Sequence, residues 1–167
     1  MGRLARIYIE GVHYHLYTRG NRKEKIFIDD EDFEYCLNVM SRSKRRYGIS
    51  LFCYCLMPNH VHFLVKPTKA RDLSKFMHWT NRAYAGYFNK KYGKVGHLWQ
   101  GRFKSKPVLK ESYLSNLADY IENNPVRANM VKDTSEYRWS SYRERCLSME
   151  FKFLSDLAET PALQGTV

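Results

Sequence analysis

The stretch LMPNHVHFLVKP, residues 56–67, places two histidines one residue apart inside an apolar run. Successive side chains of a β-strand point to opposite faces, so His60 and His62 lie on one face of the strand that this run predicts. Its β-branched and aromatic residues are typical of a buried strand, and Pro58 and Asn59 predict a turn before it. The preceding run ISLFCYCLM, residues 49–57, predicts a partner strand. The sequence therefore predicts a β-hairpin that carries two imidazoles on one face.

This histidine pair is a candidate metal site, because two imidazoles held by a sheet can converge on one divalent ion. The pattern alone is also typical of ordinary packed histidines. The chain has six histidines, and His13 and His15 form a second pair with the same spacing. We expect a metal to depend on His60 and His62 more than on this second pair.

The charge balance indicates a polyanionic partner. Lysine and arginine number 28 against 17 aspartate and glutamate, which gives a formal net charge of +11. Such a balance favours nucleic acid or an anionic membrane surface. No stretch approaches the roughly 18 apolar residues that a bilayer span needs, and no signal-peptide pattern follows Met1. We therefore expect a nucleic-acid partner and no membrane.

The four cysteines form no C-x-x-C pair and no pattern typical of a disulfide framework. Reduced cysteines fit the cytosol, so we expect a cytoplasmic protein. Cys53 and Cys55 share a strand face, and we interpret them as small buried hydrophobic residues.

Strand and helix patterns alternate along the chain. We expect strands at 12–18, 49–57, 60–66 and around 102–106, and helices at 29–47, 73–92 and 111–124. The helix at 73–92 is expected to present Phe76, Trp79, Ala83 and Tyr87 on one side. This order, without a glycine-rich phosphate loop, favours an α+β fold of ferredoxin-like type, a central antiparallel sheet flanked by helices. We expect one domain at 1–150 and a C-terminal tail at 151–167. Within the domain, the chain from Asp133 onward is expected to be a covering segment.

Basic residues gather at the fourth expected strand. Arg102, Lys104 and Lys106 alternate with Phe103 and Ser105, so a strand would present one basic face to phosphates. The preceding Trp99 could stack on an unpaired base or lie in the rim of the core. A second basic run, residues 42–46, is the alternative phosphate contact.

The last expected helix, which ends before Pro125, carries Tyr120 and Asn124 four residues apart and hence on one face. A tyrosine hydroxyl can attack a phosphodiester when a metal polarises the phosphate, and an asparagine oxygen is a hard metal ligand. A packing role is the alternative, because the chain has 13 tyrosines.

Several motifs occur in order along the chain: ARIYIEGVHYHLYTRGNRKEKIF, MPN followed by HVH, HLWQGRFKS, YIENNPVRANMV and YRWSSY. Together they resemble the REP-associated tyrosine transposases of the HUH single-tyrosine superfamily, over about residues 4–145. The resemblance implies an HUH palm with helices on both sides of the sheet. It implies that His60, His62 and Asn124 bind Mg²⁺ or Mn²⁺ and that Tyr120 is the nucleophile. Glu122 and Asn123 depart from the histidine and apolar residue expected there, which leaves proton handling beside Tyr120 open.

The resemblance further implies a metal-dependent single-strand DNA endonuclease and strand transferase that acts through a 5′-phosphotyrosine. Relatives recognise hairpin-forming repeated extragenic palindromes. The residues expected to contact DNA are Arg19, Trp99, Arg102, Lys104, Lys106 and Arg127. Two alternatives stay open: a hairpin-binding protein with a vestigial site, and a metal-dependent hydrolase of small phosphoesters. The sequence fits a monomer or a homodimer equally.

Overall fold

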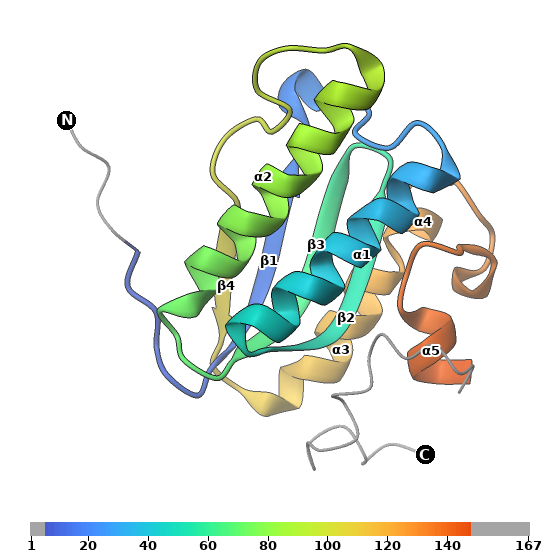
Figure 1. The fold of residues 1–167 in the computed structure, drawn as a ribbon. Coiled ribbons are helices and arrows are strands. Elements are labelled where there is room, and N and C mark those ends of the chain that lie inside the picture. The colour runs from blue at the N-terminus through green and yellow to red at the C-terminus, as the bar shows by residue number, and fades with distance from the viewer. Residues whose placement is uncertain (1–5, 148–167) are drawn as a thin grey trace.

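The computed structural model describes residues 6–147, which form a sheet with helices on both faces (Figure 1). The four strands are antiparallel and lie in the order β2-β3-β1-β4. They are β1 (His13–Arg19), β2 (Ile49–Met57), β3 (His60–Pro67) and β4 (Lys104–Val108). The predicted α+β class and central antiparallel sheet are confirmed. The predicted tail, 151–167, lies outside the described residues.

Two long helices, α1 (Asp30–Tyr47) and α2 (Asp72–Tyr92), pack together in front of the sheet in Figure 1. Behind it lie α3 (Leu114–Glu122), which packs on β2 and β3, and the short α4 (Asn124–Arg127). The last described helix is α5 (Tyr142–Leu147). Single 3₁₀ turns occur at Asn21–Lys23, Glu111–Tyr113 and Thr134–Glu136. Within residues 6–147, no helix is both long and apolar enough to cross a membrane.

Local chemistry fixes both ends of α1. Asp29 and Asp32 form a reciprocal capping box at its start, which satisfies backbone N–H groups that have no partner inside the helix. Gly48 ends the helix in the left-handed conformation, at φ 59°, where a side chain would be strained. The chain then enters β2 directly.

The predicted hairpin is formed by β2 and β3, and its turn is held from outside. The backbone N–H of Gly20 donates to the Asn59 carbonyl and that of Ile26 to the Pro58 carbonyl, both at 2.8 Å. Gly20 has to be small here, because a Cβ atom would lie 2.5 Å from the Glu24 carbonyl oxygen. This packing fixes the start of β3, where His60 lies.

The segment after Asp133 covers the outer edge of β2. The N–H of Leu56 donates to the Trp139 carbonyl at 2.9 Å, and the N–H of Ser141 donates to the Tyr54 carbonyl at 3.0 Å. The Tyr137 hydroxyl donates to the Leu56 carbonyl at 2.7 Å. These bonds satisfy backbone groups that an open sheet edge would expose.

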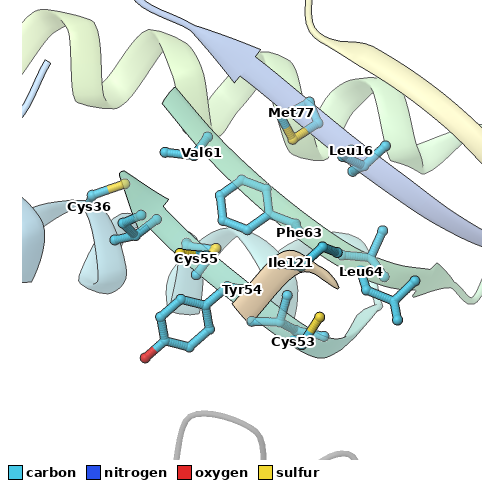
Figure 2. Close-up of a cluster of buried hydrophobic side chains, with 14 of the residues drawn as sticks. Leu16, Cys36, Cys53, Tyr54, Cys55, Val61, Phe63, Leu64, Met77 and Ile121 are labelled. Carbon is cyan, nitrogen blue, oxygen red and sulfur yellow. The ribbon is translucent and has the colours of Figure 1, made fainter. Parts of the chain in front are cut away.

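Both faces of the hairpin are buried. Figure 2 shows the hydrophobic cluster around it, with Met77 from α2 and Ile121 from α3. Cys53 and Cys55 are fully buried within this cluster, as predicted. The predicted packing side of α2 was wrong in part: its buried residues are Leu73, Phe76, Met77, Thr80, Tyr84 and Phe88.

Two expected elements differ in their bounds. The basic strand begins at Lys104, so Arg102 lies before it and does not share its alternating face. The helix expected over 111–124 is broken at Asn123, and Asn124 begins the separate helix α4. Pro125 explains the break, because it has no N–H to donate to the Ile121 carbonyl but fits the first turn of a new helix.

Candidate active site

His60 and His62 project from one face of β3 into a basic cleft of about 730 Å³. Their ring centroids lie 5.0 Å apart, with the rings nearly perpendicular. His62 is buried, whereas His60 is half-buried and its Nδ1 lies 2.6 Å from the Asn59 side-chain oxygen. The strand therefore holds both imidazoles at the mouth of one cavity.

Burial keeps these imidazoles uncharged. It lowers the pKa of His62 to about 3, and the charges of His60, His15 and Arg127 act in the same direction. Burial and the charge of Arg19 lower the pKa of His60, and burial lowers the pKa of His15 to about 4. At neutral pH the rings therefore retain lone pairs that can bind a cation.

The wall of the cleft is positively charged. Its side chains come from the end of β1, from β3 and from the approach to β4, and no aspartate or glutamate of the described chain lines it. The lining residues are Arg6, Tyr17, Thr18, Arg19, His60, His62, Gln100, Gly101, Arg102 and Lys104. A phosphate group therefore meets cations and no competing carboxylate.

A second hollow of about 970 Å³ adjoins the cleft, and the two share Arg6 and residues 100–102. Arg71 and Arg82 of α2 line it as well. None of the described carboxylates forms an ion pair with Arg71, Arg82 or Arg102. The basic surface thus continues from the histidine pair toward α2.

Three of the predicted DNA-contacting residues, Arg19, Arg102 and Lys104, line the cleft. The Arg19 Nε donates to the Gln100 side chain at 3.0 Å. Trp99 lies half-buried in the second hollow, where its indole N–H donates to the Asn81 carbonyl at 2.9 Å. It is a rim tryptophan with a fixed ring. Lys106 does not line the cleft, and its ammonium lies 5.8 Å from the Tyr17 ring centroid.

Tyr120 lies on α3 with 45% of its surface exposed. The guanidinium of Arg127 lies 4.5 Å over its ring, and the same cation contributes to the low pKa of His62. Tyr120, Asn124 and Arg127 thus lie on the α3–α4 side of the histidines, but none of them lines the cleft. The structure brings the predicted residues to one region without closing them into a single pocket.

The Asn124 side chain remains associated with the turn before it, although the helix breaks. Its Nδ2 donates to the carbonyls of Tyr120 and Ile121, at 3.2 and 3.0 Å. The amide nitrogen is therefore occupied, and no described donor bonds to the Asn124 side-chain oxygen. That oxygen is free to bind a cation.

Glu122, the departure noted in the sequence, is a structural residue. Its carboxylate is completely buried and accepts from Arg145 Nη2 at 2.7 Å and from the Ser141 hydroxyl at 2.6 Å. Arg145 also binds Asp119 at 2.5 Å, so it holds α3 at two points. Glu122 anchors the helix that carries Tyr120 and does not face solvent beside it.

Sequence reasoning did not place His15, Tyr17 or Gln100 at the site. His15 Nε2 lies 2.9 Å from His62 Nδ1, and the Tyr17 ring stacks at 5.8 Å from that of His62. His15 and Tyr17 share one face of β1, so the pairing of β1 with β3 could have revealed them. Gln100 lies in an irregular segment that carries no comparable signal.

The chemistry of the site's side chains suits a divalent ion that accepts nitrogen ligands. Within residues 6–147, no group of three or more histidine, cysteine, aspartate or glutamate side chains could hold a metal. Coordination would rest on His60 and His62, with the Asn124 oxygen as a candidate third ligand. Imidazole ligands without a carboxylate favour Mn²⁺ over Mg²⁺.

The fold and site define a class of protein: an antiparallel α+β domain with paired histidines above a basic cleft. The chain belongs to the IS200-like transposase family, whose model matches residues 8–124. This match confirms the predicted transposase family. A search of curated proteins finds no match to the sequence.

Solved structures share the fold. A REP-associated tyrosine transposase bound to a REP hairpin superposes with a TM-score of 0.72 at 19% identity, over 100% of this chain and 93% of that chain. A crystal structure of a protein from Deinococcus radiodurans R1, described as a candidate transposase, gives a TM-score of 0.50 at 20% identity. That match covers 73% of this chain and 97% of the other.

Proposed function

We propose that this chain is a metal-dependent single-strand DNA endonuclease and strand transferase that acts on hairpin-forming palindromic DNA. The observation that carries the proposal is the place of Arg127, which stacks on Tyr120 and also acts electrostatically on His62. A candidate nucleophile and a candidate metal ligand therefore lie near one cation. Family membership and the hairpin-bound relative support DNA as the substrate.

In this proposal, His60, His62 and Asn124 hold Mn²⁺ or Mg²⁺, which polarises the scissile phosphate when bound. The Tyr120 hydroxyl attacks phosphorus and loses its proton, and the bond from phosphorus to the 3′ oxygen breaks. The departing oxygen takes up a proton, which gives a 5′-phosphotyrosine and a free 3′-hydroxyl. A 3′-hydroxyl from another strand reverses the step, so joining requires no high-energy cofactor.

The remaining residues hold DNA in this proposal. Arg19, Arg102 and Lys104 bind phosphates along the cleft, and the adjoining hollow extends this path. Tyr120 is exposed, so a backbone lying over the surface can reach its hydroxyl. Arg127 can neutralise phosphate charge beside Tyr120, because guanidinium groups bind phosphate oxygens well.

One observation favours the second candidate, a hairpin-binding protein that does not cut. Tyr120 and Asn124 do not line the histidine cleft, and the Asn124 amide donates to carbonyls of α3, the preceding helix. A protein that only binds needs the basic surface but not this set of residues. The two candidates differ in whether a covalent product forms.

The test is a denaturing gel with end-labelled hairpin DNA that carries single-stranded flanks, incubated with Mn²⁺. The proposal predicts a covalent protein–DNA adduct that EDTA prevents. His60→Ala and His62→Ala should abolish the adduct and leave hairpin affinity within about tenfold, because the phosphate contacts remain. His13→Leu is the matched control, since His13 is a buried histidine of the same sheet. Tight hairpin binding without an adduct in Mn²⁺ or Mg²⁺ would support the second candidate.

A further inference from the structure

A ring nitrogen of His62 has a polar partner on the neighbouring strand, the imidazole of His15. His15 Nε2 lies 2.9 Å from His62 Nδ1, and the two ring planes are inclined by only 25°, with centroids 5.2 Å apart. Their exposed fractions are 7% and 9%, so water competes little for this bond. β1 pairs with β3 so that His15 lies opposite Leu64, diagonal to His62 on the same sheet face.

This contact constrains the tautomer of His62, because one hydrogen bond between two neutral imidazoles holds one proton. If His15 Nε2 donated, His62 would accept at Nδ1 and carry its own proton on Nε2. No lone pair would then be left on His62 for a cation. If His62 Nδ1 donates, its Nε2 is free of a proton and can bind a cation.

We propose that His15 is a positioning residue that accepts a hydrogen bond from His62 Nδ1 and so keeps His62 Nε2 unprotonated toward the cleft. The inference deepens the proposed function and rests on it for the identity of the ion. It assigns to His15, one member of the second histidine pair, a role that differs from metal binding. His15 orients the ligand from behind, as a neighbouring acceptor does for many metal-binding histidines.

Other contacts of His62 do not replace this bond. The Tyr17 ring stacks on His62 and fixes the plane of the imidazole, but stacking does not distinguish one ring nitrogen from the other. Among residues 6–147, His15 alone is within hydrogen-bond distance of a His62 ring nitrogen. Without this acceptor, His62 should therefore adopt both tautomers while its ring stays in place.

The test uses ¹⁵N-labelled full-length protein without metal, with the histidine tautomers read from two-bond ¹H–¹⁵N spectra at pH 7. The parent should show His62 with its proton on Nδ1. In His15→Leu, a substantial fraction of His62 should carry the proton on Nε2, and Mn²⁺ affinity by calorimetry should fall about 10–100-fold. His15→Gln should restore both readouts, because its side-chain oxygen can accept the bond.

His13→Leu is the matched control, since His13 is buried on the same strand, two residues before His15, and its ring centroid lies 4.8 Å from that of Phe52. It should change neither readout. A parent with the His62 proton on Nε2 overturns the inference, even if His15→Leu fails to fold. An unchanged tautomer and unchanged Mn²⁺ affinity in folded His15→Leu also overturn it.

These results are separable from the proposed function. A parent with the expected tautomer that binds Mn²⁺ but forms no DNA adduct contradicts the endonuclease and supports the inference. A parent that forms the adduct, with His15→Leu unchanged in tautomer and Mn²⁺ affinity, contradicts the inference alone.

Discussion

The guanidinium of Arg127 lies 4.5 Å over the ring of Tyr120, at the point where α3 gives way to α4. Its charge also helps to lower the pKa of His62. Arg127 is the last residue of α4, and its side chain lies across the break at Asn123 from Tyr120, the candidate nucleophile on α3. One cation thus contacts Tyr120 and acts electrostatically on His62.

We expect Arg127→Ala to reduce formation of the protein–DNA adduct at least tenfold, because phosphate charge near Tyr120 would lose its nearest cation. Mn²⁺ affinity, measured by calorimetry, should change little. Arg138→Ala is the matched control, since Arg138 also stacks on an aromatic ring, at 4.4 Å from Trp139, outside both hollows. Equal loss of adduct in the two variants would contradict a specific role for Arg127.

The strand β4 offers a test of phosphate binding. Lys104 and Lys106 are exposed and share one face of the sheet with His15 and Tyr17. Binding to single-stranded DNA should weaken steeply with salt, and replacing both lysines by alanine should make the log–log slope shallower by about 1.4. The control replaces two lysines of α2 that lie outside both hollows, Lys75 and Lys90. An unchanged slope in the β4 variant would place the phosphate path elsewhere, with residues 42–46 as the next candidates.

Stability should depend on the ion pair that anchors α3. Arg145→Met leaves the Glu122 carboxylate buried beside Ser141 without its cation, so the free energy of unfolding should fall by about 3–5 kcal/mol. Arg138→Met removes exposed ion pairs to Asp30 and Glu34 and should cost less than about 1 kcal/mol. Urea unfolding measures both. Similar losses in the two variants would contradict the anchoring role.

The buried histidines predict acid sensitivity. Burial lowers the pKa values of His13, His15, His60 and His62, so between their folded and unfolded pKa values the unfolded chain binds more protons. Stability should be unaffected above pH 7 and should fall as the pH drops from about 6.5 toward 4. Each histidine can contribute at most about 1.4 kcal/mol per pH unit.

Urea unfolding of metal-free protein across this range measures the slope, which should be shallower in His15→Leu. Burial alone would raise the pKa of the Asp32 carboxyl, but hydrogen bonds from Ile28, Lys91 and two tyrosines lower it. Asp32 therefore affects stability mainly at lower pH. A flat stability profile from pH 7 to 4.5 would contradict the burial of neutral imidazoles.

Much of the fold could be predicted from the sequence. The runs at 49–57 and 60–66 are strongly apolar and meet at a turn signal, and the observed hairpin strands agree with them to within one residue. Local signals such as the Asp29 cap and Gly48 explain the bounds of α1 equally well. The break at Asn123 was missed because Pro125 stops one helix and also suits the start of another.

The candidate site was less accessible to sequence reasoning. The face shared by His60 and His62 follows from spacing within one strand. The contact between His15 and His62 depends on the pairing of β1 with β3, two strands far apart in the sequence, so neither strand predicts it by itself. Glu122 gave no sign of its partner, because Arg145 follows 23 residues later on a separate helix, α5.

Tyr120→Phe tests the central claim most directly, because phenylalanine keeps the ring under Arg127 and removes only the hydroxyl. The variant should fold, bind Mn²⁺ and bind hairpin DNA like the parent, yet form no covalent adduct on a denaturing gel. Tyr113→Phe is the control, since Tyr113 is another exposed tyrosine shortly before α3. It should form the adduct normally. An adduct that persists in Tyr120→Phe would contradict the account, and loss of the adduct in Tyr113→Phe alone would assign the nucleophile to Tyr113.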